Sequence, residues 1–184
     1  MTAICTRPGR WTWSTSIPHT RFTDAATGDF FDLQRYPGKR SLLKGPFGNL
    51  EWALIADGVP AAEIYRELAT STGVDRAFKK LDTIKSEIVW WDYGKGSSQP
   101  YQFLSDSRVV MASAWSGGIK NPLNSGAFGT MWDYQEIDWN YWAIPKGANS
   151  DLAYEFLKLA SSPAQMARMA EAVRYGPRTW MRCR

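Results

Sequence analysis

The sequence predicts an α/β fold, and two observations support that prediction. Short apolar runs alternate along the chain with segments whose apolar residues recur at helical spacing. The runs are apolar throughout, which is typical of strands in a sheet that helices cover on both faces. With 184 residues, 44% of them hydrophobic and 22% charged, the chain suits one ordinary domain or two small lobes.

The first half predicts short helices around two strands. Pro37-Gly38 indicates a turn before a strand, and Asp57-Gly58 ends a helix, because glycine is common just past a helix. Asp75 is expected to cap a third helix. In order, the expected elements are an irregular segment over 1–27, a helical turn over 30–33, a strand over 41–43, helices over 49–56, over 60–69 and from 75, and a buried strand over 88–91.

The second half predicts further strands and helices. Ser162-Pro163 followed by Gln165 begins a helix in the manner of a capping box, with proline in the first turn. In order, we expect a loop over 94–98, a short helix over 98–104, a strand over 109–115, a linker rich in Asn, Gly and Ser over 120–130, a strand over 142–145, and helices from 150 or 151 and from 163.

The net charge of +4 comes from the two ends of the chain. Residues 1–27 hold three basic residues and one acid, and residues 174–184 hold four arginines and no acid. The body between them has 15 basic and 17 acidic residues. A nucleic-acid-binding domain needs a basic face on its folded body, so we expect no nucleic-acid partner.

The residue types also argue against an enzyme. His19 is the single histidine and lies in the N-terminal segment, so the body cannot assemble a Ser/His/Asp or Cys/His nucleophile system. Cys5 and Cys183 lack metal-ligand spacing, although a bridge between them stays open, and no glycine loop for phosphates or dinucleotides is present. We therefore expect no catalytic residue, no cofactor and no metal.

Nothing in the sequence has the pattern of a membrane-spanning or secretory segment. No run approaches the ~18 apolar residues of a membrane span. The stretch 1–27 has no apolar core of the kind that a secretory signal contains.

Ten tryptophans stand out, most of them beside carboxylates, amides or glycines. They concentrate at Trp90-Trp91-Asp92, at Trp115-Ser116-Gly117 and between Met131 and Trp142. Aromatic faces attract an organic ammonium ion, and neighbouring oxygens accept its N–H bonds. For any one tryptophan a role in the core is the better explanation, and Trp90 and Trp91 are expected to be core, but the clustering favours a site for a small organic cation.

Several collinear stretches resemble a known family. They are Tyr36–Arg40, Asn49–Pro60, Asp75–Asp82, Val89–Trp91, Val109–Ile119, Tyr141–Gly147 and Tyr175–Pro177. Their order and spacing resemble the extracytoplasmic solute-binding proteins of ATP-driven importers, in the spermidine/putrescine-binding family. The resemblance runs from about Gly28 to Arg178.

The resemblance implies a type II periplasmic-binding-protein-like fold with one complete lobe and part of the other. It implies an atypical segment over 1–27, a second-lobe domain over 28–122, a hinge return with a partial first lobe over 123–178, and an atypical tail over 179–184. The family's absent signal and first-lobe portion suggest a truncated member. A periplasmic location, a polyamine ligand and a membrane permease as partner are implied as well.

The expected ligand-binding residues combine aromatic walls with oxygen ligands. By resemblance, Trp115 looks like one wall of the cleft and Tyr175 like a second contact. Asn140 stands where the family often has an acid, so Asp138, Asp133 or Glu136 is expected to supply the negative charge. Trp132 and Glu51 complete the candidates. Each has an ordinary alternative as a core, turn or surface residue.

Two other functions stay open. Tryptophans together with Asp133, Glu136 and Asp138 also fit a carbohydrate-binding module, or a carbohydrate-active one if two carboxylates lie at a suitable distance. The chain is also consistent with a remnant that binds nothing and associates through an exposed half-cleft.

Overall fold

The computed structural model describes residues 2–6, 25–92, 94, 98–115, 128–131, 133–136 and 141–173, and for 2–6, 128–130 and 173 it describes only the backbone. The chain divides into two compact units, Met1–Glu136 and Ile137–Arg184. Each unit is described separately below.

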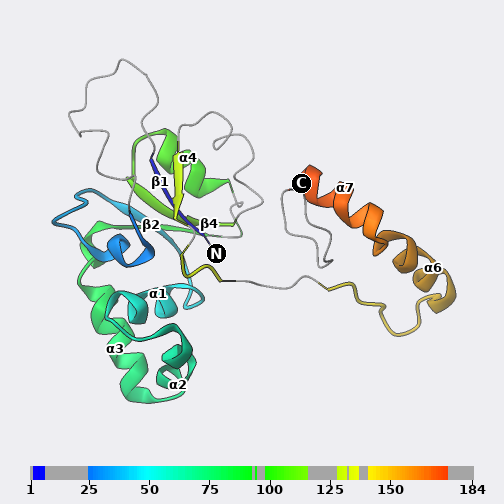
Figure 1. Ribbon diagram of the computed structural model, residues 1–184, viewed down its shortest axis with the longest axis horizontal. Coiled ribbons are helices and arrows are strands. Elements are labelled where there is room, and N and C mark those ends of the chain that lie inside the picture. The colour runs from blue at the N-terminus through cyan, green and yellow to red at the C-terminus, as the bar shows by residue number, and fades with distance from the viewer. Residues whose placement is uncertain are drawn as a thin grey trace. The chain divides into compact units, whose positions relative to one another are not determined.

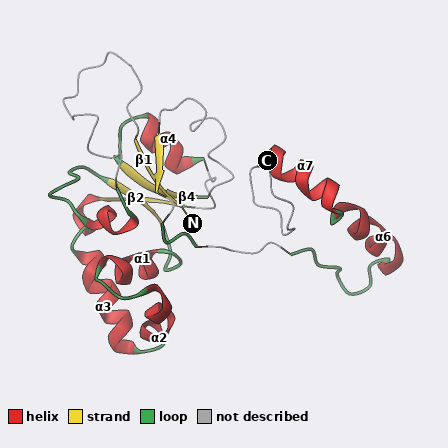
Figure 2. Cartoon of the chain, in the orientation of Figure 1, coloured by secondary structure: helices red, strands yellow, loops and turns green. Residues whose placement is uncertain are grey.

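The first unit is built on a five-stranded mixed sheet in the order β3-β2-β4-β1-β5 (Figures 1 and 2). β2 (Arg40–Leu43) pairs in parallel with β3 (Ile88–Trp91) on one side and with β4 (Met111–Ala114) on the other. β1 (Thr2–Thr6) pairs antiparallel with both β4 and β5 (Phe128–Met131). The three parallel strands therefore occupy one side of the sheet.

Helices and 3-10 turns connect these strands. In chain order they are η1 (Thr27–Phe31), α1 (Asn49–Ala56), η2 (Ala61–Glu63), α2 (Ile64–Leu68), α3 (Ser71–Asp82), η3 (Lys85–Glu87) and α4 (Gln99–Ser105). α1 contacts η1, α2 and α3, whereas α4 contacts β4. Figure 1 shows α1, α2 and α3 gathered away from α4.

Both faces of the sheet are buried, as the apolar strands predict. Leu42 and Met111 pack with Trp52 of α1 in one cluster, while Ala112 and Ala114 pack with α4 residues and Trp91 in another. Met111 and Ala112 are neighbours on β4 and face opposite sides because side chains alternate along a strand. The α/β class predicted from the sequence is confirmed.

Arg40 fixes the start of β2 from inside the core. Its side chain is fully buried and donates to the carbonyl oxygens of Phe30 at 2.8 Å, Asp32 at 2.9 Å, Tyr36 at 2.5 Å and also Gly38. These bonds hold the segment between η1 and β2 against the sheet. Burial lowers the pKa of the Arg40 guanidinium, an effect that Glu87 and Asp32 oppose.

The predicted helices of this unit form with small shifts at their ends. The prediction over 49–56 matches α1, and the prediction over 60–69 corresponds to η2 and α2. The predicted start at Asp75 is wrong, because α3 begins at Ser71. Thr70 is its N-cap, and Oγ1 of Thr70 accepts from the Gly73 N–H at 3.0 Å.

Four expectations about individual segments differ from the structure. Thr2–Thr6, expected to be irregular, forms β1, and Phe128–Met131, expected to belong mostly to a linker, forms β5. Both strands gain ladder partners from distant parts of the chain, which local composition does not reveal. Trp91 is core as expected, but Trp90 is 48% exposed. The strand expected over 142–145 is absent from the described part of the second unit, where no strand offers it a ladder.

The described part of the second unit consists of α6 (Ser150–Ala160) and α7 (Pro163–Val173), preceded by irregular chain from Tyr141 to Asn149. Asn149 caps α6, since its Oδ1 accepts from the Leu152 N–H at 3.1 Å. Both helices were predicted from their apolar spacing. Within the described part of the chain, no helix is long and apolar enough to cross a membrane.

Candidate functional site

The candidate site lies where the parallel strands end. β2 runs into the loop 44–48 that leads to α1, β3 is followed by Asp92, and β4 is followed by Trp115. Because the strands are parallel neighbours, these three segments meet at one edge of the sheet. Ligands of open α/β sheets bind outside the carboxyl ends of strands, so this edge is the place to look for a site.

Two aromatic rings form a wall at this edge. Phe47 in the loop and Trp115 after β4 stack with ring centroids 6.1 Å apart and planes 23° apart. Phe47 is 40% exposed and Trp115 is half-buried, so the pair is anchored in the protein while part of it faces solvent. The Tyr101 hydroxyl of α4 donates to the Trp115 carbonyl oxygen and holds its backbone in place.

Asn49 holds the loop that carries Phe47. Its Nδ2 donates to the carbonyl oxygens of Leu43 at 2.7 Å and Gly45 at 2.6 Å, which ties the end of β2 to the start of α1. The residue is 2% exposed. Among the described residues, Oδ1 of Asn49 receives no hydrogen bond. It is therefore a buried, unused acceptor next to the loop 44–48 that carries Phe47.

Two carboxylates lie at the N-terminus of α1, beside Gly48, the residue that follows Phe47. Glu51 Oε2 accepts from the Gly48 N–H at 3.0 Å. The Glu136 carboxylate lies over Gly48 so closely that an added Cβ would be 3.2 Å from either of its oxygens. Gly48 has φ +79°, a conformation that glycine adopts freely and that brings the backbone close to this carboxylate. The helix dipole favours negative charge at such a position.

The surroundings of Glu136 change its proton affinity. Burial, with a further contribution from the charge of Glu51, raises the pKa of Glu136 from an ordinary 4.5 to about 7. The pKa of Tyr65 on α2 is also raised, first by desolvation and then by the charges of Glu51 and Glu136. The start of α1 therefore holds two acidic side chains whose negative charges repel one another, and a cation there would reduce this repulsion.

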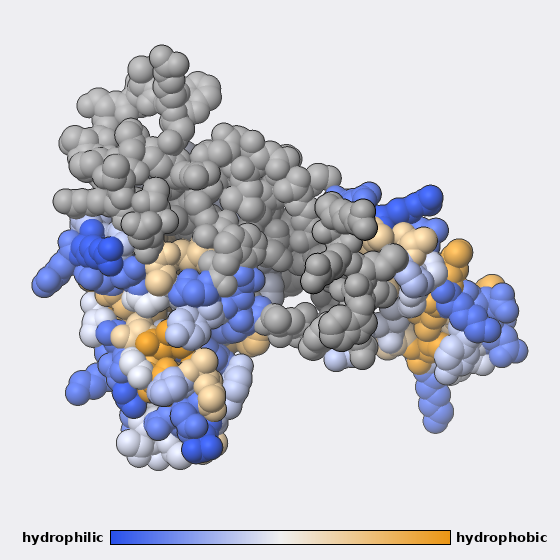
Figure 3. All heavy atoms as spheres, in the orientation of Figure 1, coloured by the Kyte–Doolittle hydropathy of each residue, from blue (hydrophilic) through white to orange (hydrophobic). Residues whose placement is uncertain are grey.

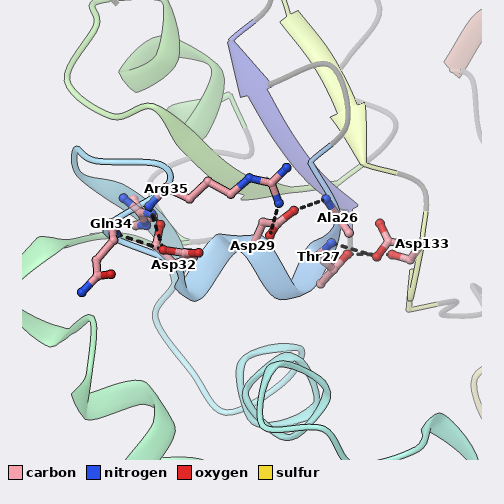
Figure 4. Close-up of polar contacts among 8 residues, drawn as sticks. Ala26, Thr27, Asp29, Asp32, Gln34, Arg35 and Asp133 are labelled. Atoms are coloured by element: carbon pink, nitrogen blue, oxygen red, sulfur yellow. Dashed lines mark hydrogen bonds and ion pairs between the residues drawn. The ribbon is translucent and has the colours of Figure 1, made fainter. Parts of the chain in front are cut away.

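The neighbouring Asp133 forms hydrogen bonds within the fold. Its Oδ2 accepts from the Thr27 N–H at 2.8 Å, and its carbonyl oxygen accepts from the Thr27 hydroxyl at 2.7 Å (Figure 4). In the same segment, the Tyr134 carbonyl accepts from Nε1 of Trp52 at 3.2 Å. Asp133 therefore fastens the segment 133–136 to η1 and α1. The expectation that it replaces a ligand-binding acid is not supported by this geometry.

A separate hollow of about 500 Å³ lies between η1, the turn after it and the end of α3. Its acids already serve the local backbone. Asp29 accepts from the Ala26 N–H at 2.9 Å and pairs with Arg35 at 3.4 Å, and Asp32 accepts from the N–H groups of Gln34 and Arg35 (Figure 4). These contacts make the hollow part of the loop structure rather than a site with acids directed at a ligand.

Of the six ligand-binding residues expected from the sequence, two lie within the described residues. Trp115 follows β4 at the edge of the sheet where the parallel strands end. Glu51 lies in the first turn of α1, which begins after the loop at the same edge. Tyr175, Asn140, Asp138 and Trp132 lie outside the described residues. Sequence reasoning missed Phe47 and Asn49. A single aromatic within the turn Gly45-Pro46-Phe47-Gly48 has no periodic signal, and only the pairing of β2 with β4 brings it to Trp115. Within the described part, no group of three or more His, Cys, Asp or Glu residues could hold a metal.

Comparison with known proteins identifies the family. Residues 11–179 match the model of the bacterial extracellular solute-binding proteins, and the chain belongs to this family. It is 42% identical over 151 residues to the gamma-aminobutyric acid-binding protein of Pseudomonas aeruginosa, a match that covers 81% of this chain and 42% of that protein.

Solved structures agree with the fold. The Atu4243-GABA receptor is 32% identical, with a TM-score of 0.69 over 96% of this chain and 50% of that structure. The spermidine/putrescine substrate-binding protein PotD of Streptococcus pneumoniae is 16% identical with a TM-score of 0.63, again over 96% of this chain and 50% of that one, and at this identity it shows the fold alone. The predicted type II periplasmic binding fold is confirmed. The chain spans about half the length of these relatives.

Proposed function

We propose that the chain is part of the substrate-binding component of an ATP-driven importer and that its ligand is a small ammonium compound of the amino-acid type, with 4-aminobutyrate (GABA) as the first candidate. The single observation that carries the proposal is the 42% identity to a gamma-aminobutyric acid-binding protein over 81% of this chain. The aromatic wall and the acidic start of α1 support it independently.

The site chemistry suits an ammonium group. Phe47 and Trp115 offer ring faces, and an ammonium over such a face gains about 0.5–2 kcal/mol depending on how far it is desolvated. Glu51 and Glu136 supply negative potential beside Gly48, the residue after Phe47, and bonds between an ammonium and carboxylate or amide oxygens are of the strong, charge-assisted kind. Trp132, Asp138, Asn140 and Tyr175 are proposed as further contacts on the basis of the sequence resemblance.

The choice between an amino acid and a polyamine depends on the far end of the ligand. GABA carries one ammonium and one carboxylate, whereas putrescine carries two ammonium groups. A polyamine remains the second candidate because the electronegative start of α1, with Glu51 and Glu136, would favour a dication. The 16% identity to the spermidine/putrescine protein contributes only the fold to this argument.

The family context extends the proposal to location and partner. The family consists of extracellular solute-binding proteins, so we propose that the whole protein acts in the periplasm and delivers its solute to a membrane permease. We also propose that 28–122 belong to the second lobe, that 123–178 hold the hinge return and part of the first lobe, and that 1–27 and 179–184 are atypical ends.

Isothermal titration calorimetry with GABA, putrescine and maltose tests the proposal. We expect heat with GABA, a smaller response with putrescine and none with maltose. Trp115→Ala should weaken GABA binding about tenfold or more, since it removes one ring of the wall and releases the other. Trp90→Ala is the matched control, because Trp90 is a partly exposed tryptophan on β3 outside the stacked pair.

Three outcomes would overturn parts of the proposal. Binding of maltose without the amines would favour a carbohydrate module. Tight putrescine binding without GABA binding would favour the polyamine. Absence of heat with every ligand, from a chain whose buried Trp52 and Trp91 show native fluorescence, would favour a remnant that binds nothing.

A further inference from the structure

One buried hydroxyl joins the three parallel strands at their carboxyl ends. Polar residues, in blue, make up much of the visible described surface of the first unit (Figure 3), but Ser113 on β4 is fully buried. A buried polar group needs hydrogen-bond partners. Oγ of Ser113 accepts from the Leu43 N–H at 3.2 Å and from Nε1 of Trp91 at 3.3 Å. Leu43 ends β2 and Trp91 ends β3, so a single oxygen atom holds both strands to β4.

This hydroxyl replaces backbone pairing between β2 and β4. β2 pairs with β3 as far as Leu43 opposite Trp91, but its ladder with β4 ends at Ser41 opposite Ala112. Beyond that pair, the Leu43 N–H donates to the side chain of Ser113 rather than to a carbonyl oxygen of β4. The spacing of β2 and β4 at their carboxyl ends therefore depends on one side chain.

The strand order reverses between β2 and β4. The chain runs from β2 outward to β3 and then returns past β2 to β4. The two connections cover opposite faces of the sheet, with α1 packed against Leu42 and Met111 and α4 packed against Ala112 and Ala114. Ligands of α/β sheets bind in the crevice at such a reversal. Ser113 therefore holds the strands together at the place where a ligand is expected.

The same two strand ends carry the rings of the aromatic wall. Leu43 leads into the loop 44–48 with Phe47, and Trp115 follows two residues after Ser113. The stacking of Phe47 on Trp115 thus depends on the distance between two backbones that Ser113 connects. A gap of ~0.5–1 Å forfeits about a quarter to a half of the dispersion attraction between two atoms, so a small change in strand spacing changes the ring contact.

We propose that Ser113 is a positioning residue of the ligand site: its hydroxyl sets the spacing of β2 and β4, and thereby the fit of Phe47 and Trp115 to the ligand. Ser113 acts through the two rings and has no contact with the ligand itself, since it is fully buried. The proposal rests on the proposed function for the identity of the ligand, whereas the stacking of the two rings can be measured without any ligand.

Ser113→Ala in the full chain tests the proposal in the ligand-free state. Stacked rings shift one another's proton signals in nuclear magnetic resonance spectra. The shift that Trp115 causes in the Phe47 signals is the part that disappears in Trp115→Ala. Ser113→Ala should reduce this shift by about half or more, because the strand ends separate once their shared acceptor is lost.

Calorimetry with GABA gives the second measurement. Ser113→Ala should weaken the affinity about fivefold, the change that one ordinary hydrogen bond corresponds to. In a Trp115→Ala background the same substitution should cause no further loss of affinity, because the wall that Ser113 positions is already gone.

Ser41→Ala is the matched control. Ser41 is also a fully buried serine, and its hydroxyl donates to the Val89 carbonyl oxygen at 2.8 Å within the ladder of β2 and β3. Its replacement should lower the urea midpoint as Ser113→Ala does, but leave the Phe47 shift and the GABA affinity unchanged. Trp91→Phe removes one of the two donors to Ser113 and keeps a large ring, so it should move the Phe47 signals in the same direction as Ser113→Ala.

Two results would overturn the proposal. One is an unchanged Phe47 shift in Ser113→Ala, or in Trp91→Phe if Ser113→Ala does not fold, which would make Ser113 a residue of the core alone. The other is an equal loss of GABA affinity in Ser113→Ala and Ser41→Ala, which would trace the loss to general destabilisation. Failure of the unaltered chain to bind GABA contradicts the proposed function instead, and the Phe47 shift then still decides for or against Ser113.

Discussion

Replacement of Asn49 by alanine tests how the strand edge holds the aromatic wall. The side chain is 2% exposed and donates to Leu43 and Gly45 at 2.7 and 2.6 Å. Alanine removes both bonds and leaves two backbone acceptors without these donors. A neutral hydrogen bond contributes about 1 kcal/mol net, and stranding a buried acceptor costs ~1–3 kcal/mol. Removing the unpaired Oδ1 offsets part of the loss.

We therefore expect Asn49→Ala to lower the free energy of unfolding of the first unit by about 1.5–3 kcal/mol. The loop 44–48 should also lose its fixed position, so the ligand would have to order Phe47 on binding. An ordering cost of ~1 kcal/mol corresponds to a roughly fivefold weaker affinity for GABA.

Urea unfolding followed by the fluorescence of the buried Trp52 and Trp91 measures the stability, and calorimetry measures the affinity. Asn149→Ala is the matched control: it removes an asparagine that caps α6, should cost about 1 kcal/mol of helix stability in the second unit, and should leave GABA affinity unchanged. A stability loss below ~0.5 kcal/mol for Asn49→Ala, with normal affinity, would refute this account of the loop.

Two further predictions concern charged groups. Arg40→Met should destabilise the first unit by about 3–5 kcal/mol in urea unfolding, because four carbonyl oxygens lose a buried donor, and a loss under ~1 kcal/mol would contradict the clamp described for Arg40. Glu136 has a folded-state pKa raised from 4.5 to about 7, so the folded state binds its proton more tightly than the unfolded state does. The stability that Glu136 contributes should be present in full below about pH 4.5 and should decline as the pH rises through about 7. Linkage gives about 3 kcal/mol as the upper bound of this loss in unfolding free energy, and solvent screening reduces the expected loss to roughly 1–2 kcal/mol. Glu136→Gln should flatten this decline between pH 5 and 8, and an unchanged profile would show that another group titrates.

Much of the fold could be predicted because local signals were sufficient. α1 has its predicted bounds, and its end is marked by Asp57-Gly58, where Gly58 has φ +85°. β2 and β3 follow from short apolar runs between turn residues. For α3 the predicted cap, Asp75, lies inside the helix, and the cap in the structure is Thr70, five residues earlier.

The remainder depends on contacts between distant segments. β5 lies partly in a stretch whose composition indicates a linker, and its strand conformation comes from pairing with β1, which is more than a hundred residues away. The run 142–145 shows the reverse case, since its apolar composition suits a strand but the described part of its unit offers no ladder. Local pattern predicts which segments can be strands, and topology decides which segments are.

The site follows the same division. The sequence makes Trp115 a candidate through its position after an apolar strand, and it includes Glu51 among the candidates. Phe47 and Asn49 could not be identified, because their role arises from the pairing of β2 with β4 and from side-chain bonds across the loop.

Intermolecular nuclear Overhauser effects between GABA and the protein test the central claim most directly. In a sample with labelled aromatic side chains, with the Trp115 signals assigned by Trp115→Phe, the account predicts contacts from the ligand's methylene protons to the rings of Trp115 and Phe47. Binding of GABA with contacts to other aromatic rings and none to this pair would contradict the claim that the ligand lies against the wall at the carboxyl ends of β2 and β4.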